Sequence, residues 1–472
     1  MNSALVQDVV GEVMRRLGEK RPLPAVPRTQ TSAGSYGVFS TVDAAVTAAT
    51  EAQKKLLKLP MEDRDGIVKL IKSIAKDNAR EWGAMELEET KVGRLDHKIE
   101  KLQILELVPG VEYLRTRASS GSNGLCIEEF APFGVLGVVT PVTHSIPTLS
   151  ANAINMIASG NSLVANAHPS AANCAAHAIR QYNKQIAAKY GIDGLITCVM
   201  PPTLETAEQL FSHRGIALLV ITGGPAVARA ALAAKKRAIV AGPGNPPVVV
   251  DETACLQNAA TSIVKGAAYD NNLLCIGEKQ VVCVESIFDK FLGQMKMAGG
   301  FVLNSSQIEA LTKAAFKTDA KGHPHVNKDF VGKDASVLAA AAGANIPPTT
   351  QLLVGETSAD HPFVQEEQMM PFVPFVRVKN VDEAIERAVE SEHGYRHTAI
   401  IHSRNIDTIT RFGRQANTTL FVVNGPSMAG LGLGGEGYLS YSIATPTGEG
   451  ITTPLTFTRY RRVVMTKTLR VI

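Results

Sequence analysis

Short apolar runs separated by amphipathic, helix-forming stretches fill most of the chain from residue 38 onward. Helical periodicity predicts helices over residues 41–59 and 64–89, and Ala- and Ile-rich helical stretches such as LSANAINMIAS and AANCAAHAIRQYNKQI lie between later apolar runs. Near-continuous apolar strands alternating with helices are typical of parallel sheets covered on both faces. The pattern therefore predicts an α/β protein with two α/β domains, followed by a β appendage from Ser440 onward. The expected strands are VLGVVTPV, SLVANA, IALLVIT, AIVAG and PVVVD between residues 135 and 251, and then QVVCV, LLVG, TAIIH and TLFVVNG.

Residues 1–20 carry a different pattern. Apolar side chains recur there at three- and four-residue steps with polar side chains between them, which predicts an amphipathic helix. Residues 21–37 are rich in Pro, Ser, Thr and Gly and predict an extended linker. Such a helix on a tether cannot bury its apolar face locally, so we expect it to bind a partner; the alternative is a frayed terminus. Its apolar positions are Leu5, Val6, Val9, Val10, Val13, Met14 and Leu17.

Composition narrows the class of protein. The 48 Lys and Arg residues nearly balance the 44 Asp and Glu residues, which argues against a partner that is a nucleic acid or a membrane surface. The six cysteines include no CxxC pair, so we expect neither a disulfide framework nor a metal site. No signal peptide and no apolar run near eighteen residues is evident, and a reducing, cytoplasmic setting is expected.

Two glycine-rich segments are candidate cofactor sites. Gly430, Gly432 and Gly435 fit the pattern GxGxxG, but loop or strand sequence follows them, which favours a glycine loop that lines a site. The segment ITGGPAVARAAL joins an apolar strand to a helix of small residues at Thr222, Gly223 and Gly224. A helix that begins after a glycine turn presents free N–H groups to a pyrophosphate. A plain strand–turn–helix connection explains these residues equally well.

Cys275 lies in AYDNNLLCIGEK, a polar stretch between two apolar ones. A nucleophilic thiol must be accessible and benefits from a helix start or another positive potential. Asn271 and Asn272 are the expected local donors. A lone cysteine is more often inert, and spacing alone leaves that alternative open; Cys283, inside KQVVCVE, is expected to be a buried hydrophobic residue.

Several segments resemble, in sequence and in order, the aldehyde dehydrogenase superfamily, and together they span nearly all of residues 38–472. HPSA at His168, SIATPTGEG at Ser442 and the TRYRR end resemble more narrowly the coenzyme-A-acylating propionaldehyde and acetaldehyde dehydrogenases of bacterial microcompartments. The segments are PFGVLGVVTP (132–141), ASGNSLV (158–164), ITGG (221–224), GPGNPPVVVDETA (242–254), the Cys275 segment, EEQMMPFVPFV (366–376) and HTAIIHSRN (397–405).

The resemblance implies the aldehyde dehydrogenase fold. A Rossmann-like cofactor-binding domain would cover residues 38–242, with a bridging hairpin at about 118–131. An α/β catalytic domain would cover residues 243–438, and residues 439–472 would form a bridging tail for oligomerisation into a dimer or tetramer. Residues 1–20 resemble the encapsulation peptides of microcompartment enzymes, which implies shell or core proteins as partners and the microcompartment lumen as location.

The resemblance also implies roles for individual residues. Cys275 would attack the aldehyde carbonyl, and the resulting thiohemiacetal would give hydride to NAD and leave a thioester. Glu367 would contact the nicotinamide ribose, and His168 with Pro169 would lie near the adenosine ribose. Thr222, Gly223 and Gly224 would lie beside the cofactor.

Hydrolytic members of the family carry a glutamate that activates water, just before a pair of glycines. That pair aligns with Pro243 and Gly244, which places Ala241 at the glutamate position, 34 residues before Cys275. Loss of a general base slows water attack by about 10²–10⁴. A thiol needs less help, so coenzyme A is the expected acyl acceptor.

His144 departs from the family pattern. PVTHSIPT places it where the family has an asparagine that helps to hold the oxyanion. A neutral histidine can donate one N–H, so an oxyanion hole with the Cys275 amide is one interpretation, and a structural role is the other.

Three functions stay open at this point. The first is NAD-dependent oxidation of a short aldehyde, propionaldehyde ahead of acetaldehyde, to its coenzyme A thioester. The others are a hydrolytic aldehyde dehydrogenase and a catalytically silent microcompartment scaffold. The chain length of the aldehyde and the choice between NAD and NADP are not determined by any single residue.

Overall fold

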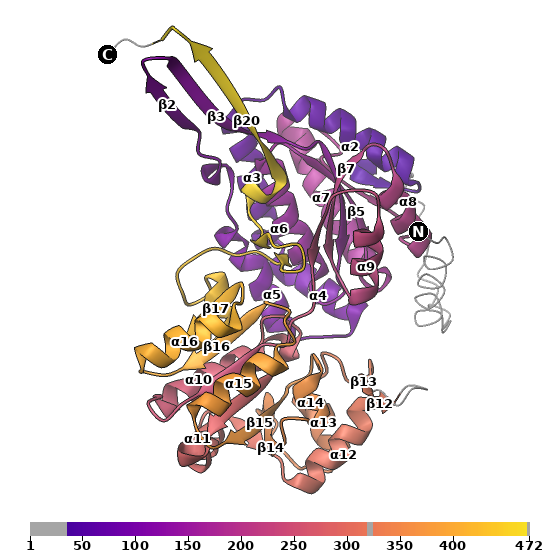
Figure 1. Ribbon diagram of the computed structural model, residues 1–472. Helices are drawn as coiled ribbons and strands as arrows, with labels where there is room; N and C mark the ends of the chain where they lie inside the picture. The colour runs from indigo at the N-terminus through magenta and orange to yellow at the C-terminus, as the bar shows by residue number, and fades with distance from the viewer. Residues whose placement is uncertain (1–34, 319–323, 470–472) are drawn as a thin grey trace.

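The computed structural model describes residues 35–318 and 324–469, which form two α/β lobes and a projecting β arm (Figure 1). The amphipathic helix expected over residues 1–20 lies outside the described residues, as does the linker up to residue 34. The first described element is the short 3-10 helix η1 (Ser35–Gly37).

Six parallel strands form the sheet of the first lobe, in the order β1-β6-β5-β4-β7-β8. Every residue of β4, β5 and β6 is buried, which explains why these strands are continuous apolar runs. The strands are β1 (Val38–Phe39), β4 (Val135–Thr140), β5 (Ser162–Ala167), β6 (Ile196–Val199), β7 (Ile216–Thr222) and β8 (Ala238–Ala241).

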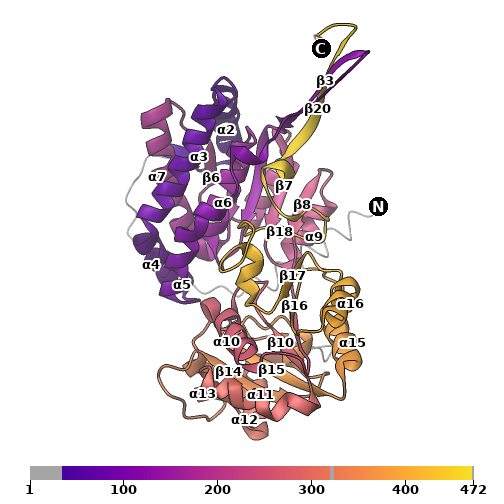
Figure 2. The same ribbon diagram turned by 90° about the vertical axis from the view of Figure 1, so that its left-hand side faces the viewer.

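Helices cover both faces of this sheet. Because side chains alternate along a strand, β4 directs Leu136 and Val138 toward α3, α6 and α7, and directs Val135 and Val139 toward α2, α8 and α9. Helices α4 and α5 extend the first group toward the second lobe (Figure 2). The helices are α2 (Val42–Leu56), α3 (Met61–Asp77), α4 (Ala79–Thr90), α5 (Leu95–Gln103), α6 (Ser145–Ala158), α7 (Ala172–Tyr190), α8 (Leu204–Ser212) and α9 (Pro225–Ala233).

The second lobe has a seven-stranded parallel sheet in the order β11-β14-β15-β10-β9-β16-β17. Helices α10 and α11 pack on one face and α15 and α16 on the other, while α12, α13 and α14 cover the β11–β14 end. Cys283 is fully buried in β10, as expected. The elements are β9 (Pro247–Val250), α10 (Leu256–Ala267), β10 (Gln280–Val284), α11 (Glu285–Met297), β11 (Gly300–Val302), α12 (Ser305–Ala315), α13 (Ala335–Ala341), β14 (Leu352–Thr357), α14 (Pro362–Gln365), β15 (Phe372–Val378), α15 (Val381–Ser391), β16 (Thr398–His402), α16 (Ile406–Ala416) and β17 (Leu420–Val423).

The arm is an antiparallel sheet of β2 (Arg117–Gly121), β3 (Gly124–Pro132) and the C-terminal β20 (Thr458–Thr466). It projects away from both lobes (Figure 1). Tyr460, Val463 and Val464 on β20 are exposed hydrophobic residues.

Residues 439–457 do not lie in the arm but pack between the lobes (Figure 2). Ser159 donates a hydrogen bond to the Pro454 carbonyl (2.7 Å), and the Asn161 amide donates to the Phe457 carbonyl (2.9 Å). The C-terminal segment, including β18 (Ile443–Ala444), β19 (Gly450–Ile451) and η7 (Pro454–Phe457), is therefore part of the first lobe's core.

The predicted α/β class is confirmed, with one difference in the helices. The single helix predicted over residues 64–89 is two helices, α3 and α4, because the backbone leaves helical geometry at Asn78 (φ −99°, ψ 9°). The Asn78 amide hydrogen-bonds the Ile74 carbonyl (2.7 Å), the local competition with helix that asparagine favours. None of the described helices is long and apolar enough to cross a membrane.

Candidate active site

Four adjacent strands of the first sheet end beside one another and carry most of the residues singled out in that lobe. Thr222 and Ala241 are the last residues of β7 and β8 and pair across the two strands. His168 directly follows β5, and its amide donates to the Thr140 carbonyl at the end of β4 (3.2 Å). His144 follows β4 after three further residues. The carboxyl edge of a parallel sheet is where α/β proteins bind ligands.

The turn at Thr222, Gly223 and Gly224 leads into α9. Gly224 is the N-cap of α9 and provides no side-chain cap, so the first N–H groups of this helix have no intrahelical partner. A Cβ atom on Gly224 would meet nothing within 4 Å. Open space in front of free N–H groups fits the pyrophosphate of NAD.

Ser442 of the C-terminal segment joins this turn to α6. Its hydroxyl lies 2.7 Å from the Thr222 hydroxyl and donates to the side-chain Oδ1 of Asn152 (3.1 Å). The sequence analysis found Ser442 only as part of a motif. The hydroxyl pairing shows that the C-terminal segment is part of the site's wall.

His168 is set up as a donor. Its Nδ1 accepts a hydrogen bond from the Ser170 amide (3.1 Å), so in the neutral ring the proton is on Nε2. Burial, and then the nearby Lys328 ammonium, lower the pKa of His168. Pro169 begins the short η4 helix (Pro169–Ala171) that fixes this turn. A neutral ring with a free N–H fits a ribose hydroxyl.

Cys275 belongs to the second lobe and lies in a turn after the 3-10 helix η5 (Tyr269–Asn272). Asp270, Asn271 and Asn272 all have left-handed backbones, with φ of 50°, 56° and 63°. Asn and Asp tolerate this conformation better than other L-residues. Three such residues in a row turn the chain sharply before the cysteine.

The side chains of Asn271 and Asn272 do not serve the thiol, and the expectation that they are its donors is wrong. The Asn271 amide donates to the Gly332 carbonyl (3.0 Å) and to Asp334 (2.8 Å). The Asn272 amide donates to the Ala267 and Glu278 carbonyls (2.9 and 3.0 Å). Both amides stabilise the loop because its left-handed turns leave backbone carbonyls without regular partners.

Lys279, which the sequence analysis missed, supplies the positive charge near the thiol. Its buried ammonium donates to three oxygens of the loop: Asn272 O (2.8 Å), Asn272 Oδ1 (2.5 Å) and Leu274 O (3.1 Å). Burial lowers the pKa of Lys279 to about 8. In the sequence, Lys279 stands between Cys275 and the apolar run QVVCV, and a charged residue at that place could have indicated a role near the thiol.

The thiol itself is not ionised in the free protein. Burial raises the pKa of Cys275 to about 12, the Glu367 carboxylate adds to the increase, and the Lys279 ammonium opposes it. Burial also raises the pKa of Glu367 to about 7, against Lys279 and the Gly244 backbone. Lys279 therefore supplies the positive potential expected at the nucleophile, but burial and Glu367 have the larger combined effect on the pKa of Cys275.

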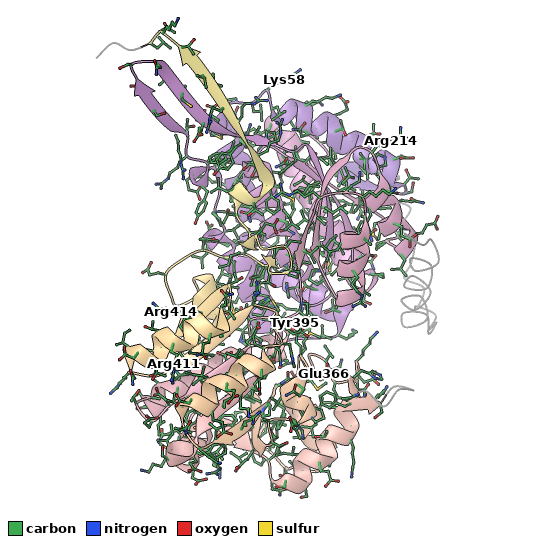
Figure 3. All side chains as sticks on the ribbon, in the orientation of Figure 1. Lys58, Arg214, Glu366, Tyr395, Arg411 and Arg414 are labelled. Atoms are coloured by element: carbon green, nitrogen blue, oxygen red, sulfur yellow. The ribbon has the colours of Figure 1, made fainter. Side chains whose placement is uncertain are left out.

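The segment that joins the lobes crosses the nucleophile turn. A Cβ atom on Gly244 would lie 2.6 Å from the Cys275 carbonyl oxygen and 2.9 Å from Cγ of His397. Burial lowers the pKa of His397 to about 4, so this ring is neutral. Glu366 and Tyr395, labelled in Figure 3, lie on the second lobe where it faces the first.

His144 occupies the N-cap position of α6 with a buried ring. Its Nδ1 has no hydrogen-bond partner among the described residues, and its ring lies 5.6 Å from the Tyr441 ring between centroids. Burial, together with Lys101 and Lys98, holds the pKa of His144 well below its usual value. A neutral ring with an unpartnered nitrogen can donate to a ligand atom.

Ala241 ends β8 beside Thr222, and its methyl side chain cannot act as a general base. Among the described residues, no cluster of three or more His, Cys, Asp or Glu side chains could hold a metal ion. The chemistry of the site therefore rests on a thiol, a buried lysine, neutral histidines and free backbone N–H groups.

Comparison with known proteins agrees with this geometry. The aldehyde dehydrogenase family profile matches residues 27–437. The acetylating acetaldehyde dehydrogenase EutE of Salmonella typhimurium is 43% identical, and the alignment covers 100% of both chains. The propionaldehyde dehydrogenase of a Clostridium phytofermentans fucose-utilisation microcompartment superposes with a TM-score of 0.90 at 40% identity, over 93% of this chain and 100% of that one.

A second solved structure bears on the chemistry. The propionaldehyde dehydrogenase of Rhodopseudomonas palustris, described with bound coenzyme A and an acylated cysteine, superposes with a TM-score of 0.89 at 42% identity, over 92% of this chain and 99% of that one. The present chain belongs to the aldehyde dehydrogenase family and, within it, to the coenzyme-A-acylating aldehyde dehydrogenases.

Proposed function

We propose that this chain oxidises a short aliphatic aldehyde, propionaldehyde ahead of acetaldehyde, to its coenzyme A thioester with NAD as oxidant, through Cys275. Two features together carry the proposal. Lys279 holds the loop that contains Cys275, and β8 ends in Ala241, which has no basic side chain. This arrangement provides a nucleophile and omits the base that would direct its acyl product to water. The hydrolytic and scaffold alternatives lack support from the relatives, whose names describe acylating enzymes.

The reaction begins at Cys275. The Cys275 sulfur adds to the aldehyde carbonyl carbon as its thiol proton passes to solvent, while the Cys275 amide and His144 donate to the developing oxyanion. The Thr222–Gly224 turn, His168, Pro169 and Glu367 would hold NAD, which would supply the acceptor for the hydride when bound. Loss of that hydride leaves a thioester on Cys275, and the coenzyme A thiolate then displaces the Cys275 sulfur as acyl-coenzyme A.

Single-turnover kinetics tests the acceptor. With aldehyde and NAD but no coenzyme A, NADH should reach about one equivalent per site and then stop, because Ala241 cannot activate water. Cys275→Ala should abolish the burst, whereas Cys255→Ala, a change at an exposed cysteine elsewhere in the lobe, should leave it intact. Sustained acid formation by the unaltered protein would refute the thioester route.

Chain length and cofactor choice need a separate measurement. One methylene is worth about 0.8 kcal/mol of burial, which corresponds to roughly a fourfold preference in kcat/KM. Comparing two-, three- and four-carbon aldehydes with NAD and with NADP tests the order given above. A preference for acetaldehyde would move the substrate assignment by one carbon without altering the mechanism.

We propose that the chain assembles through the arm into a homo-oligomer, a dimer or tetramer. Exposed Tyr460 and Val464 lie on the same face of β20, on a sheet that projects from the lobes. Tyr460→Glu with Val464→Glu should shift the mass in light scattering toward the monomer while the burst in each subunit persists. An unchanged mass would place the interface elsewhere.

Residues 1–20 are proposed to direct the enzyme to shell or core proteins in a microcompartment lumen. The apolar stripe described from the sequence provides a few kcal/mol of burial in a matching groove. A reporter fused to residues 1–37 should form foci in cells that make shell proteins, and Val9→Glu with Val13→Glu should disperse them. Diffuse signal from the unaltered fusion would remove this role.

A further inference from the structure

Four charged side chains lie buried at the junction of the two lobes, on the far side of the nucleophile loop. Glu86 of α4, Lys98 and Lys101 of α5 and Asp270 of η5 are each at most 2% exposed. Lys98 and Glu86 are 2.9 Å apart, and Lys101 pairs with Asp270. Burying such pairs gives little net stability compared with apolar side chains of similar size. A role other than stability therefore has to be considered for this cluster.

Asp270 fastens the Cys275 loop to the first lobe. Besides Lys101, its carboxylate accepts from the Arg94 amide (2.7 Å), and its own amide donates to Nδ1 of His97 (2.9 Å). A Cβ atom on Gly93 would lie 2.3 Å from Oδ1 of Asp270, so these two segments of the chain are in direct contact. The left-handed turn that begins five residues before Cys275 is thus held by the start of α5.

Glu86 and Lys98 hold the backbone on both sides of His144. Oε2 of Glu86 accepts a hydrogen bond from the Ile146 amide in the first turn of α6 (3.0 Å), and the Lys98 ammonium donates to the Thr143 carbonyl (3.4 Å). The His144 ring itself makes no hydrogen bond through Nδ1. Its position therefore depends on these two backbone contacts and on packing against Tyr441.

We propose that the cluster of Glu86, Lys98, Lys101 and Asp270 is a positioning device that sets the Cys275 loop and His144 at the separation that the reacting carbonyl requires. The inference rests on the proposed function, in which these two elements hold the oxyanion from opposite lobes. Oxyanion donors act only within a few tenths of an ångström of their place. A salt-bridged cluster that contacts both elements supplies that constraint, whereas a flexible lobe junction does not.

The test removes both charges of one pair so that no unpaired charge stays buried. Lys101→Met with Asp270→Asn retains an oxygen acceptor for the Arg94 amide, and asparagine tolerates the left-handed backbone. The burst without coenzyme A should keep its amplitude of about one NADH per site, while its rate constant falls about 10- to 100-fold. The Kd for NAD should stay unchanged. Arg377→Met with Glu356→Gln removes the ion pairs of Arg377 with Glu356 and Asp289 on the second lobe and should alter none of these.

A double-mutant cycle with His144→Ala separates positioning from general weakening. If the cluster acts through His144, the cluster variant should slow the His144→Ala protein by less than about threefold. The inference would be overturned if the cluster variant slowed the His144→Ala protein by the same factor as it slows the unaltered protein. An unchanged burst rate in the cluster variant would also overturn it. Glu86→Gln with Lys98→Met removes the other pair without leaving an unpaired buried charge and keeps an acceptor for the Ile146 amide; it should slow the burst about 3- to 10-fold and decides the question if the first double variant does not fold. Absence of any burst in the unaltered protein would instead refute the proposed function.

Discussion

Gly244 lies so close to Cys275 that a Cβ atom at Gly244 would stand 2.6 Å from the Cys275 carbonyl oxygen. The segment that links the two lobes therefore rests directly on the backbone of the nucleophile. Gly244 is required for space, because its φ lies outside the left-handed range. The link, the nucleophile turn and the His397 ring form one packed unit.

Gly244→Ala should consequently damage the site. The methyl group would meet backbone on one side and the His397 ring on the other, and such overpacking costs about 1–3 kcal/mol. We expect a lower thermal midpoint and a larger loss of kcat than of NAD affinity. Gly293→Ala in α11, where a Cβ atom meets nothing within 4 Å, should instead raise stability by about 0.5–1 kcal/mol. Equal behaviour of the two variants would contradict this account.

The pKa relation between Cys275 and Glu367 predicts how fast the thiol is alkylated. Above about pH 7 Glu367 ionises, and its negative charge raises the pKa of Cys275, so alkylation should rise less than tenfold per pH unit between pH 6 and 8. Glu367→Gln removes that charge, which should bring the slope closer to tenfold and speed alkylation most at pH 8; the remaining deficit comes from Lys279, which loses its proton near pH 8. The measurement is iodoacetamide labelling of the Cys275 peptide in a Cys255→Ser background. A Gln variant that reacts more slowly at pH 8 would exclude the electrostatic effect.

The sequence predicted the sheets well because their signal is local. Apolar runs such as SLVANA and IALLVIT coincide with β5 and β7, since buried parallel strands contain few polar residues. The turn at Thr222 and the alignment of Ala241 with the end of β8 followed from motif order. These features depend on residues close together in the chain.

The buried charges could not be found in that way. Lys101 and Asp270 are 169 residues apart, and each alone has the pattern of a solvated polar residue. Their burial depends on how the lobes meet, which no local pattern encodes. The run Asp270, Asn271 and Asn272 is a usable turn signal, because these residue types tolerate positive φ, whereas the sequence analysis predicts only that Asn271 and Asn272 are donors.

His144 should affect kcat through a neutral ring. Because burial and the two nearby lysines keep its pKa well below the usual value, kcat should not titrate near pH 6.5. His144→Ala should lower kcat by roughly 10²–10³ if the ring donates to the oxyanion, and His144→Asn should recover part of the loss. The Kd for NAD, measured by fluorescence titration, should change little in either variant. A near-normal kcat for the alanine variant would reduce His144 to packing.

Ala241→Glu should convert part of the activity to hydrolysis. The new carboxylate would belong to the last residue of β8, which pairs with Thr222 across the strands, at the position where the sequence resemblance places the glutamate of hydrolytic family members. Without coenzyme A, the variant should continue past one NADH per site and release free acid at least about tenfold faster than the unaltered protein, because a well-placed general base contributes about 10²–10⁴. Burial of a carboxylate beside the core lowers stability, so the matched control is Ala241→Gln, which adds the same volume without a base. Acid measured by chromatography after several turnovers should appear only with glutamate. Equal acid from the glutamine variant would mean that water enters through enlarged space, and that the missing base is not what directs the acyl group to a thiol.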